Sequence, residues 1–356
     1  MGFFRVMSLA VGAISLIFGV LVPIAVKLTC QVDQFKWVVP PGSISGKTVI
    51  VTGANSGLGF ETARVLAKEG AVVVMACRSV AKCKAAMDDI RREDAKANLK
   101  AQLLDLSDPN SVRSFAAEFL ASHDRLDLLI NNAAIMATAY SSVRWPGGTV
   151  EKQFATNHLG PFLLTGLLQQ VLEATSGARV VNHSSSASDF CKRVGDVHKI
   201  AHVSQAEYYA FSDVYACSKR ANRYFTWSLN QRLKKVLSVA CHPGWTGTNL
   251  QHRATGAKAP FMSDTLLEFL AAAANAAYSQ TPKLGAQPQL YAATESPLEG
   301  GEVVGPRFFM IGTPVVETSE FCQLGSHPSA GRCSQGDLDT LWAESERLAG
   351  FIYNKV

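Results

Sequence analysis

The segment Lys47–Gly59, KTVIVTGANSGLG, decides the fold. It begins with a short β-branched run, KTVIVTG, and ends in the turn TGANSGLG, whose glycines Gly53, Gly57 and Gly59 are spaced G-x-x-x-G-x-G. The next residues, ETARVLAKEG (61–70), predict a helix closed by its final glycine. A glycine turn between a strand and a helix lets the backbone approach a pyrophosphate, and the helix N-terminus supplies N–H donors. An ordinary tight turn is the alternative.

Strands and helices alternate along the rest of the chain. Further strands are predicted at 71–78, 99–106, 126–134, 178–186 and 237–244. Further helices are predicted at 81–96, 107–123, 150–174, 214–235, 264–280 and 338–352. The strands are near-continuous apolar runs joined by short turns, which is typical of a parallel sheet covered on both faces. We therefore expect an α/β fold with a doubly wound parallel sheet and helices on both faces.

The composition suits a globular α/β protein. The chain has 356 residues, 47% of them hydrophobic, which is enough for one large domain or two small ones. Its net charge is +5, and its lysines and arginines are scattered without long runs. We therefore expect no nucleic-acid partner.

The eight cysteines show no CxxC motif and no regular spacing, so no metal site is expected. Several lie in apolar runs such as VVVMACR and LSVACHPG, as reduced core cysteines do. We therefore expect a thiol-reducing compartment for the main domain. A disulfide between Cys322 and Cys333 in the tail is the alternative.

The N-terminus carries a separate signal. Residues 7–26 contain no charge and are long enough to cross a bilayer core of about 30 Å as a helix. A cleaved signal peptide is the alternative, although no small-x-small cleavage site follows the run. We therefore divide the chain into a membrane anchor (1–30), a linker (31–46) and one domain (47–356). The slight excess of lysine after the span predicts a single-pass protein of the endoplasmic reticulum whose domain faces the cytosol.

The end of the second predicted strand indicates the cofactor. It reads ACRS, with Arg78 where dinucleotide folds that use NAD usually carry a carboxylate. A guanidinium favours the 2′-phosphate of NADP(H) instead. NADP(H) is therefore the expected cofactor, and a surface arginine at a strand end is the alternative.

Tyr215 and Lys219 lie four residues apart in DVYACSKRAN (213–222) and share one face of a predicted helix. A cation one turn away lowers the pKa of tyrosine, which suits acid–base catalysis. Upstream, VVNHSSS ends at the carboxyl edge of the sheet, where a serine could hold a carbonyl oxygen. Pro161 has no N–H for the carbonyl of Asn157, so that carbonyl could hold a water, unless the proline only kinks the helix.

Together these motifs resemble the short-chain dehydrogenase/reductase family. TGANSGLG, NNAA, NHLGPFLL, VVNHSSS, YACSK and HPGWTGT occur in the family's order over about residues 46–300. ACRS, HPGWTGTNL, QPQLYAATESPLEGG and LWAESERL resemble its retinol-dehydrogenase-like branch. The resemblance implies a Rossmann-type domain, and the N-terminal anchor also fits that branch.

The resemblance also implies roles for individual residues. Tyr215 is the acid–base residue, and Lys219 lowers its pKa and binds the nicotinamide ribose. Ser185 orients the carbonyl, and the backbone carbonyl of Asn157 holds a relay water. The implied cofactor-binding residues are Gly53, Asn55, Ser56, Gly57, Leu58, Gly59, Arg78, Asp105, Leu106, Asn131, Ala133, Tyr215, Lys219, Pro243, Gly244 and Thr248.

The sequence departs from the family pattern in two places. Ser185 precedes Tyr215 by 30 positions, which is longer than usual, and we expect the extra residues (189–212) to cap the substrate pocket. His183 replaces the usual apolar residue two before the reactive serine, so Ser184 and Ser186 remain alternatives to Ser185.

The expected function is that of a membrane-anchored, NADP(H)-dependent oxidoreductase that interconverts a carbonyl and an alcohol. The anchor and the branch indicate a lipophilic substrate: a retinoid, a long-chain or polyprenyl aldehyde, or a sterol. A light-dependent protochlorophyllide-type reductase and a noncatalytic NADP-binding scaffold are the alternatives. Membrane lipid is an expected partner, and a homodimer is left open.

Overall fold

The computed structural model describes residues 37–208, 210–248, 279–295, 297–308, 311–318 and 334–354. The expected anchor and most of the expected helix at 264–280 lie outside these residues. So do Cys322 and Cys333. Within the described residues, no helix has the length and apolar character needed to cross a membrane.

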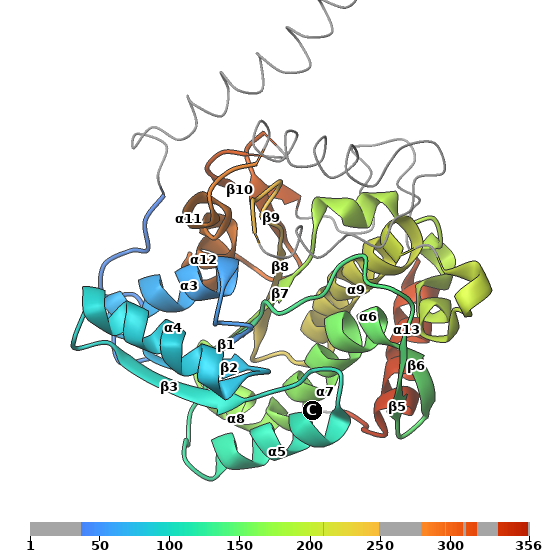
Figure 1. The fold of residues 1–356 in the computed structure, drawn as a ribbon, viewed down its shortest axis with the longest axis horizontal. Helices are drawn as coiled ribbons and strands as arrows, with labels where there is room; N and C mark the ends of the chain where they lie inside the picture. The colour runs from blue at the N-terminus through green and yellow to red at the C-terminus, as the bar shows by residue number, and fades with distance from the viewer. Residues whose placement is uncertain are drawn as a thin grey trace, which may run out of the picture.

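An eight-stranded sheet runs through the centre of the domain (Figure 1). Its strands are β1 (Thr48–Thr52), β2 (Val72–Cys77), β3 (Asn98–Leu103), β4 (Leu128–Asn131), β7 (Arg179–His183), β8 (Leu237–Cys241), β9 (Val303–Pro306) and β10 (Pro314–Thr318). Their order is β3-β2-β1-β4-β7-β8-β9-β10, and every neighbouring pair is parallel except β9 and β10. The strand order reverses between β1 and β4, and α/β sheets bind ligands at the carboxyl edge beside such a point.

Helices cover both faces of the sheet, so the predicted doubly wound α/β architecture is confirmed. One side carries α3 (Gly57–Lys68), α4 (Val80–Glu93), α11 (Pro282–Gly285) and α12 (Gln287–Thr294). The other carries α5 (Pro109–Leu120), α6 (Lys152–Phe154), α7 (Gly160–Leu167), α8 (Gln169–Ala174), α9 (Ala216–Arg232) and α13 (Gln335–Ala349). Alternate residues of β1 serve the two layers, because Ile50 packs on the α9 side while Val49 and Val51 pack on the α3 side.

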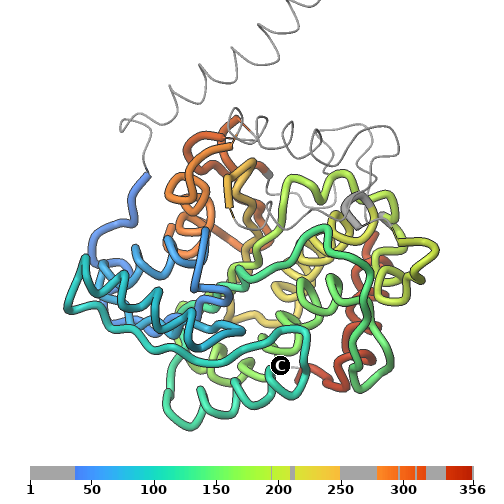
Figure 2. Tube along the Cα trace, in the orientation of Figure 1, coloured from blue at the N-terminus to red at the C-terminus, as the bar shows by residue number. Residues whose placement is uncertain are grey.

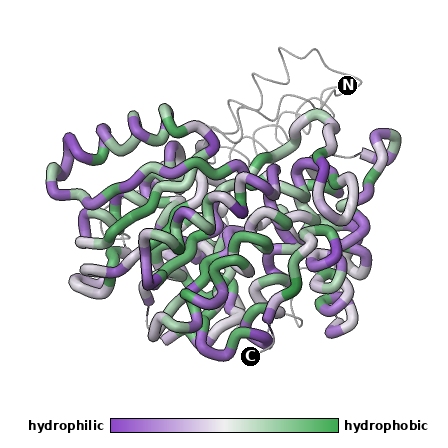
Figure 3. The backbone as a smooth tube through the Cα atoms, turned by 90° about the horizontal axis from the view of Figure 1, so that it is seen from below, coloured by the Kyte–Doolittle hydropathy of each residue, from purple (hydrophilic) through white to green (hydrophobic). Residues whose placement is uncertain are grey.

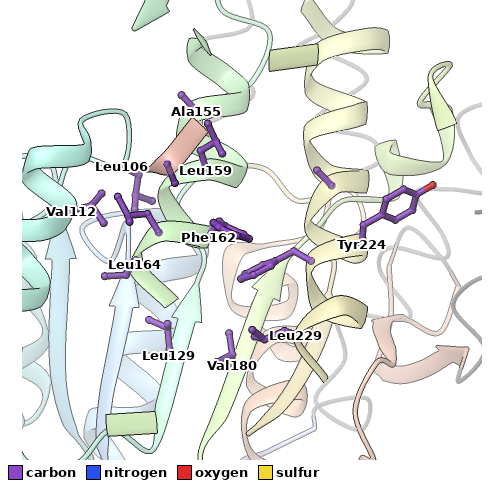
Figure 4. Packing of buried hydrophobic residues seen from close by; sticks show 14 of the residues in the cluster. Leu106, Val112, Leu129, Ala155, Leu159, Phe162, Leu164, Val180, Tyr224 and Leu229 are labelled. Atoms are coloured by element: carbon purple, nitrogen blue, oxygen red, sulfur yellow. The ribbon is translucent and has the colours of Figure 1, made fainter. Parts of the chain in front are cut away.

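The larger core lies between the sheet and the α7–α9 layer. Leu129 of β4 and Val180 of β7 meet Phe162 of α7 and Leu229 of α9, as Figure 4 shows. All four side chains are fully buried. Hydrophobic residues are concentrated along the inner strands and hydrophilic ones towards the periphery (Figure 3). This packing fixes the position of α9 on the sheet. The predicted lysine lies in α9, and the predicted tyrosine is the N-cap residue of that helix.

The predicted helix at 150–174 is interrupted. Its first two residues, 150 and 151, instead belong to a strand. They end a small antiparallel hairpin, β5 (Ser142–Trp145) and β6 (Gly148–Glu151), which was not predicted from the sequence. The helix then contains a π-helical turn, η3 (Ala155–Leu159), before α7. Pro161 explains the interruption, since it cannot donate the regular backbone hydrogen bond to residue 157.

The long insert before the tyrosine forms short helical turns, η4 (Ser186–Phe190), η5 (Val194–His202) and η6 (Gln205–Glu207). A π-helical turn, η7 (Ala210–Tyr215), then leads into α9. The insert lies beside the C-terminal helix α13 (Figure 2), where His202 Nε2 is 2.7 Å from Glu344 Oε1.

The expectation of reduced cysteines is wrong for four of them. Disulfides join Cys77 to Cys83 and Cys191 to Cys217, and Cys241 is free and buried. Burial was predicted correctly for Cys77 and Cys241, the cysteines in the quoted apolar runs, and the other three are buried as well. The pairing was missed because it depends on Cα–Cα distances of 6.1 and 4.7 Å that the tertiary structure sets. The cysteines therefore no longer support a thiol-reducing compartment.

Candidate active site

The glycine turn occupies the carboxyl end of β1. Gly53 has a φ of +68° and Gly57 a φ of +57°, in the left-handed region that favours glycine. Gly59 is required by close packing, because a Cβ there would lie 2.5 Å from the carbonyl oxygen of Gly53. Ser56 is the N-cap of α3, and its side chain makes no capping hydrogen bond. The first N–H groups of α3 are thus available to an anionic ligand.

Two other segments hold the turn in place. Thr52 Oγ1 accepts hydrogen bonds from the N–H groups of Asn132 and Ala133, each at 2.9 Å. The side chain of Thr248, which follows β8, lies 3.5 Å from the position a Cβ on Gly57 would occupy. The carboxyl ends of β1, β4 and β8 therefore meet around one glycine-lined cradle. A cradle that a Cβ would fill, at the open N-terminus of a 12-residue helix, fits a pyrophosphate.

Arg78 follows β2 directly and is exposed. Within the described residues, no ion pair joins it to a carboxylate. Asp105 is held locally, since its Oδ1 accepts from the N–H and the hydroxyl of Ser107 at 2.9 and 2.7 Å. Leu106 is buried, and its carbonyl oxygen packs against Gly160.

The side chain of Asn131 is buried and hydrogen-bonded within the protein. Its Nδ2 donates to Asn182 Oδ1 on β7 at 2.9 Å and to Thr165 Oγ1 on α7 at 3.2 Å. The side chain is 2% exposed and bridges two strands and a helix. A contact between Asn131 and a cofactor would therefore have to come from its backbone.

The predicted tyrosine, lysine and serine come together at the same edge. Tyr215 ends η7 and caps α9, and Lys219 Nζ lies 5.9 Å from the centre of the Tyr215 ring. Ser185 lies near enough to Tyr215 for its side chain to act on the pKa of the tyrosine hydroxyl, which it lowers. Lys219 Nζ also donates to the carbonyl of His183 at 2.9 Å, which ties α9 to the end of β7.

Burial governs the ionisation of this pair. It raises the pKa of Tyr215 to about 12, and the side chain of Ser185 offsets only part of the shift. It lowers the pKa of Lys219 to about 7. The expectation that the pKa of Tyr215 lies below its ordinary value is thus not met in this structure, because the two side chains are 4% and 1% exposed.

The three serines after β7 have different environments. Ser184 is fully buried, and its hydroxyl donates to the carbonyl of Lys219 at 2.8 Å. Ser185 Oγ accepts from the N–H of Ala187 at 3.1 Å and meets Tyr215. Ser186 begins η4. Of the three, Ser185 is the one whose side chain acts on Tyr215.

Asn157 connects the π-helical turn to its surroundings. Its amide exchanges two hydrogen bonds with the backbone of Ile135, each 2.9 Å long. Its Nδ2 also donates to Ser218 Oγ at 3.0 Å, and that hydroxyl donates to the carbonyl of Tyr215 at 2.7 Å. The side chain of Asn157 thus links the segment after β4 to the start of α9.

The insert packs against the segment that follows β4. The hydroxyl of Tyr208 donates to the carbonyl of Thr138 at 2.8 Å, and Gln153 Nε2 donates to that hydroxyl at 2.5 Å. The rings of Tyr140 and Tyr208 meet edge-on, 5.3 Å between centroids. The insert thus contacts the segment after β4 through this aromatic pair and through the Tyr208 hydroxyl.

The sequence did not reveal a chain of buried hydrogen bonds that starts at His183. His183 Nδ1 lies 2.6 Å from Gln289 Oε1 on α12, and Gln289 Nε2 donates to Thr62 on α3 at 2.8 Å. Burial lowers the pKa of His183 to about 3, so the ring is neutral. The only signal in the sequence was the presence of a histidine at a position that is usually apolar.

Comparison with known proteins agrees with this geometry. A family model described as short chain dehydrogenase matches residues 47–195. Retinol dehydrogenase 13 of Homo sapiens is 36% identical over 316 residues, covering 86% of this chain and 86% of that protein. Retinol dehydrogenase 12 of Bos taurus is 44% identical over 202 residues, covering 56% of this chain and 61% of that protein. The crystal structure of an uncharacterized protein from Mycobacterium paratuberculosis matches with a TM-score of 0.64 and 33% identity, covering 89% of this chain and 99% of that one.

The chain therefore belongs to the short-chain dehydrogenase/reductase family of oxidoreductases, which use nicotinamide cofactors. Within that family it belongs to the retinol-dehydrogenase-like branch, so the predicted resemblance is confirmed.

Proposed function

We propose that the protein is a membrane-anchored, NADP(H)-dependent enzyme that interconverts a carbonyl and an alcohol on a lipophilic substrate. The observation that carries the proposal is the meeting of the Ser185 and Tyr215 side chains beside Lys219. This meeting occurs at the sheet edge that also holds the glycine turn.

The cofactor would lie across the carboxyl ends of β1 and β4, where the strand order reverses. Gly53, Asn55, Ser56, Gly57, Leu58 and Gly59 would hold its pyrophosphate, and Pro243, Gly244 and Thr248 would approach its nicotinamide end. Arg78 would bind the 2′-phosphate, because it is an exposed cation with no carboxylate partner in the described part of the chain. Bound there, the nicotinamide would supply or accept the hydride.

Tyr215 would carry the proton. In the reductive direction its hydroxyl donates to the carbonyl oxygen, while the hydroxyl of Ser185 holds the same oxygen by a second hydrogen bond. With a pKa of about 12, Tyr215 keeps its proton at neutral pH and is ready to donate it. In the oxidative direction Tyr215 would first have to lose its proton, and the alcohol oxygen would then give its proton to the tyrosinate.

Lys219 and Asn157 would restore that proton. Lys219 has a pKa near 7, so it gains and loses a proton within the physiological range. A water on the carbonyl of Asn157 would connect Lys219 to solvent. The side chain of Asn157 supports this role, because its bonds to Ile135 and Ser218 hold the π-helical turn beside the start of α9.

The substrate class rests on two observations. Tyr140, from the segment after β4, and Tyr208, from the insert, form an aromatic pair, which would suit an apolar substrate better than a small polar one if the pair lines the pocket. Two relatives of this chain are named retinol dehydrogenases. A retinoid is therefore the first substrate to test, followed by long-chain and polyprenyl aldehydes and sterols.

Residues 1–30 would anchor the domain in a membrane. Trp37, the first described residue, is already packed on the domain, since its indole N–H donates to Glu295 at 3.3 Å and its ring packs on Tyr291 at 5.3 Å. An anchor ending before Trp37 would thus leave the domain intact. We place the domain on the cytosolic face of the endoplasmic reticulum. This placement depends only on the excess of lysine after the span, because the disulfides mean that the cysteines no longer indicate a reducing compartment.

The decisive experiment is Tyr215→Phe, with Tyr291→Phe as the matched control that removes a distant hydroxyl. Turnover of NADPH with all-trans-retinal, farnesal, a long-chain aldehyde and a ketosteroid is followed by nicotinamide absorbance. Tyr215→Phe should lower kcat by roughly 10² or more and leave the Kd for NADPH unchanged. Near wild-type turnover in this variant would refute the proposal, as would a wild type that binds NADPH and turns over none of the substrates.

A further inference from the structure

One disulfide joins the two segments that carry the proposed catalytic groups. Cys217 lies in the first turn of α9, two residues after Tyr215 and two before Lys219. Cys191 follows η4 and is six residues beyond Ser185. The bond between them brings their Cα atoms to 4.7 Å. It therefore closes a covalent loop, residues 191–217, that contains Tyr215 and begins six residues after Ser185.

Polar contacts hold the same two segments together. Arg220 Nε donates to the carbonyl of Ser188 at 3.0 Å, and an Arg223 guanidinium nitrogen lies 3.0 Å from Asp189 Oδ1. Both arginine side chains are less than a tenth exposed. The turn η4 is thus attached to α9 by a hydrogen bond, an ion pair and a disulfide, and the disulfide is the attachment nearest Tyr215 in the sequence.

We propose that the Cys191–Cys217 disulfide is a positioning element that holds Ser185 against Tyr215, and that its redox state sets the turnover number. The inference rests on the proposed function, since it acts through that serine and tyrosine. Two hydroxyls that must hold one substrate oxygen tolerate little displacement, because a shift of about 1 Å in a reacting group can cost about 10²-fold in rate. Without the disulfide, only noncovalent contacts would hold η4 on α9.

The redox step is a thiol–disulfide exchange. A dithiol reductant attacks one sulfur, the Cys191–Cys217 bond breaks, and two electrons and two protons from the dithiol leave two protein thiols while the dithiol becomes a disulfide. Cys191 is the more accessible sulfur, since Cys217 is fully buried and Cys191 lies between the exposed residues Phe190 and Lys192.

The test compares oxidised, reduced and reoxidised wild type with Cys191→Ala and Cys191→Ala/Cys217→Ala, under saturating NADPH and the best substrate of the panel above. Thiol counting by mass spectrometry establishes the state of each pair. Reduction of the wild type and the Cys191→Ala substitution should each lower kcat by about tenfold, with the NADPH Kd unchanged. Oxidised glutathione should restore the reduced wild type, while the double variant should not respond to reductant. Cys83→Ser, which breaks the other disulfide, is the matched control and should not show this loss of kcat.

Several outcomes would overturn the inference. These are two free thiols at Cys191 and Cys217 in the fully active wild type, full kcat after confirmed reduction, or a lower melting temperature with kcat unchanged. If the substituted chains do not fold, the reversible reduction of the wild type decides. The Tyr215→Phe variant distinguishes a failure of the proposed function from a failure of this inference. An active Tyr215→Phe refutes the proposed function. An inactive Tyr215→Phe together with a fully active Cys191→Ala refutes only the proposed role of the disulfide.

Discussion

The sharpest prediction concerns Gly59 in the first turn of α3. In Gly59→Ala the new Cβ would lie 2.5 Å from the Gly53 carbonyl oxygen and 2.5 Å from Asn132 Nδ2, about 1 Å inside normal contact. Both neighbours are held by hydrogen bonds, since Asn132 Nδ2 donates to the carbonyl of Thr52 at 2.8 Å and the N–H of Gly53 donates to the carbonyl of Ala76 at 2.7 Å. The glycine turn must therefore move away from α3. Overpacking of this kind costs about 1–3 kcal/mol, which corresponds to a Kd for NADPH weakened roughly 5- to 150-fold.

The assay is calorimetric titration of the folded variant with NADPH, with thermal unfolding as a check on the fold. Gly177→Ala is the matched control: Gly177 has a φ of +72°, so alanine there is strained by about 1–2 kcal/mol, but its Cβ would meet nothing within 4 Å and the site is distant. The control should lose stability and keep its NADPH affinity. A Gly59→Ala protein that binds NADPH within twofold of wild type would refute the placement of the cofactor on this turn.

Three further predictions concern Arg78, the N-terminal segment and His158. Arg78→Asp should weaken NADPH binding by a few kcal/mol through lost attraction and added repulsion while changing NADH binding far less, and a wild type that already prefers NADH would contradict the assignment. Deletion of residues 1–36 should give a folded, NADPH-binding protein in the soluble fraction while the full chain needs detergent, and protease should reach the domain in sealed microsomes; full protection would place the domain in the lumen. His158 is fully buried, and burial lowers its pKa to about 3. As the pH drops below about 6.5, this histidine takes up a proton in the unfolded chain but not in the folded one, so the free energy of unfolding should fall. Between pH 6.5 and 4.5 His158→Gln should remove about 2–3 kcal/mol of that loss in urea unfolding, and an unchanged pH dependence would contradict it.

Local patterns in the sequence determined much of the fold. The glycine turn, the apolar strands around it and the helices between them follow from periodicities of a few residues, which the chain shows directly. The same holds for Tyr215 and Lys219, because a spacing of four on a helix places two side chains on one face whatever surrounds them. Pro161 likewise marked the point where the helix is interrupted, since its missing N–H is a property of the residue itself.

Features that depend on distant segments were decided only by the tertiary structure. The three serines 184–186 are alike in sequence, and only the position of α9 distinguishes the one that meets Tyr215 from the one that faces the backbone of Lys219. Burial in the assembled core raises the pKa of Tyr215, although the cation Lys219 lies only four residues further along the sequence. The two disulfides join cysteines whose approach depends on how β2 meets α4 and how the insert folds back on α9. Sequence thus fixes what each residue can do, and the packing of remote elements fixes which residues do it together.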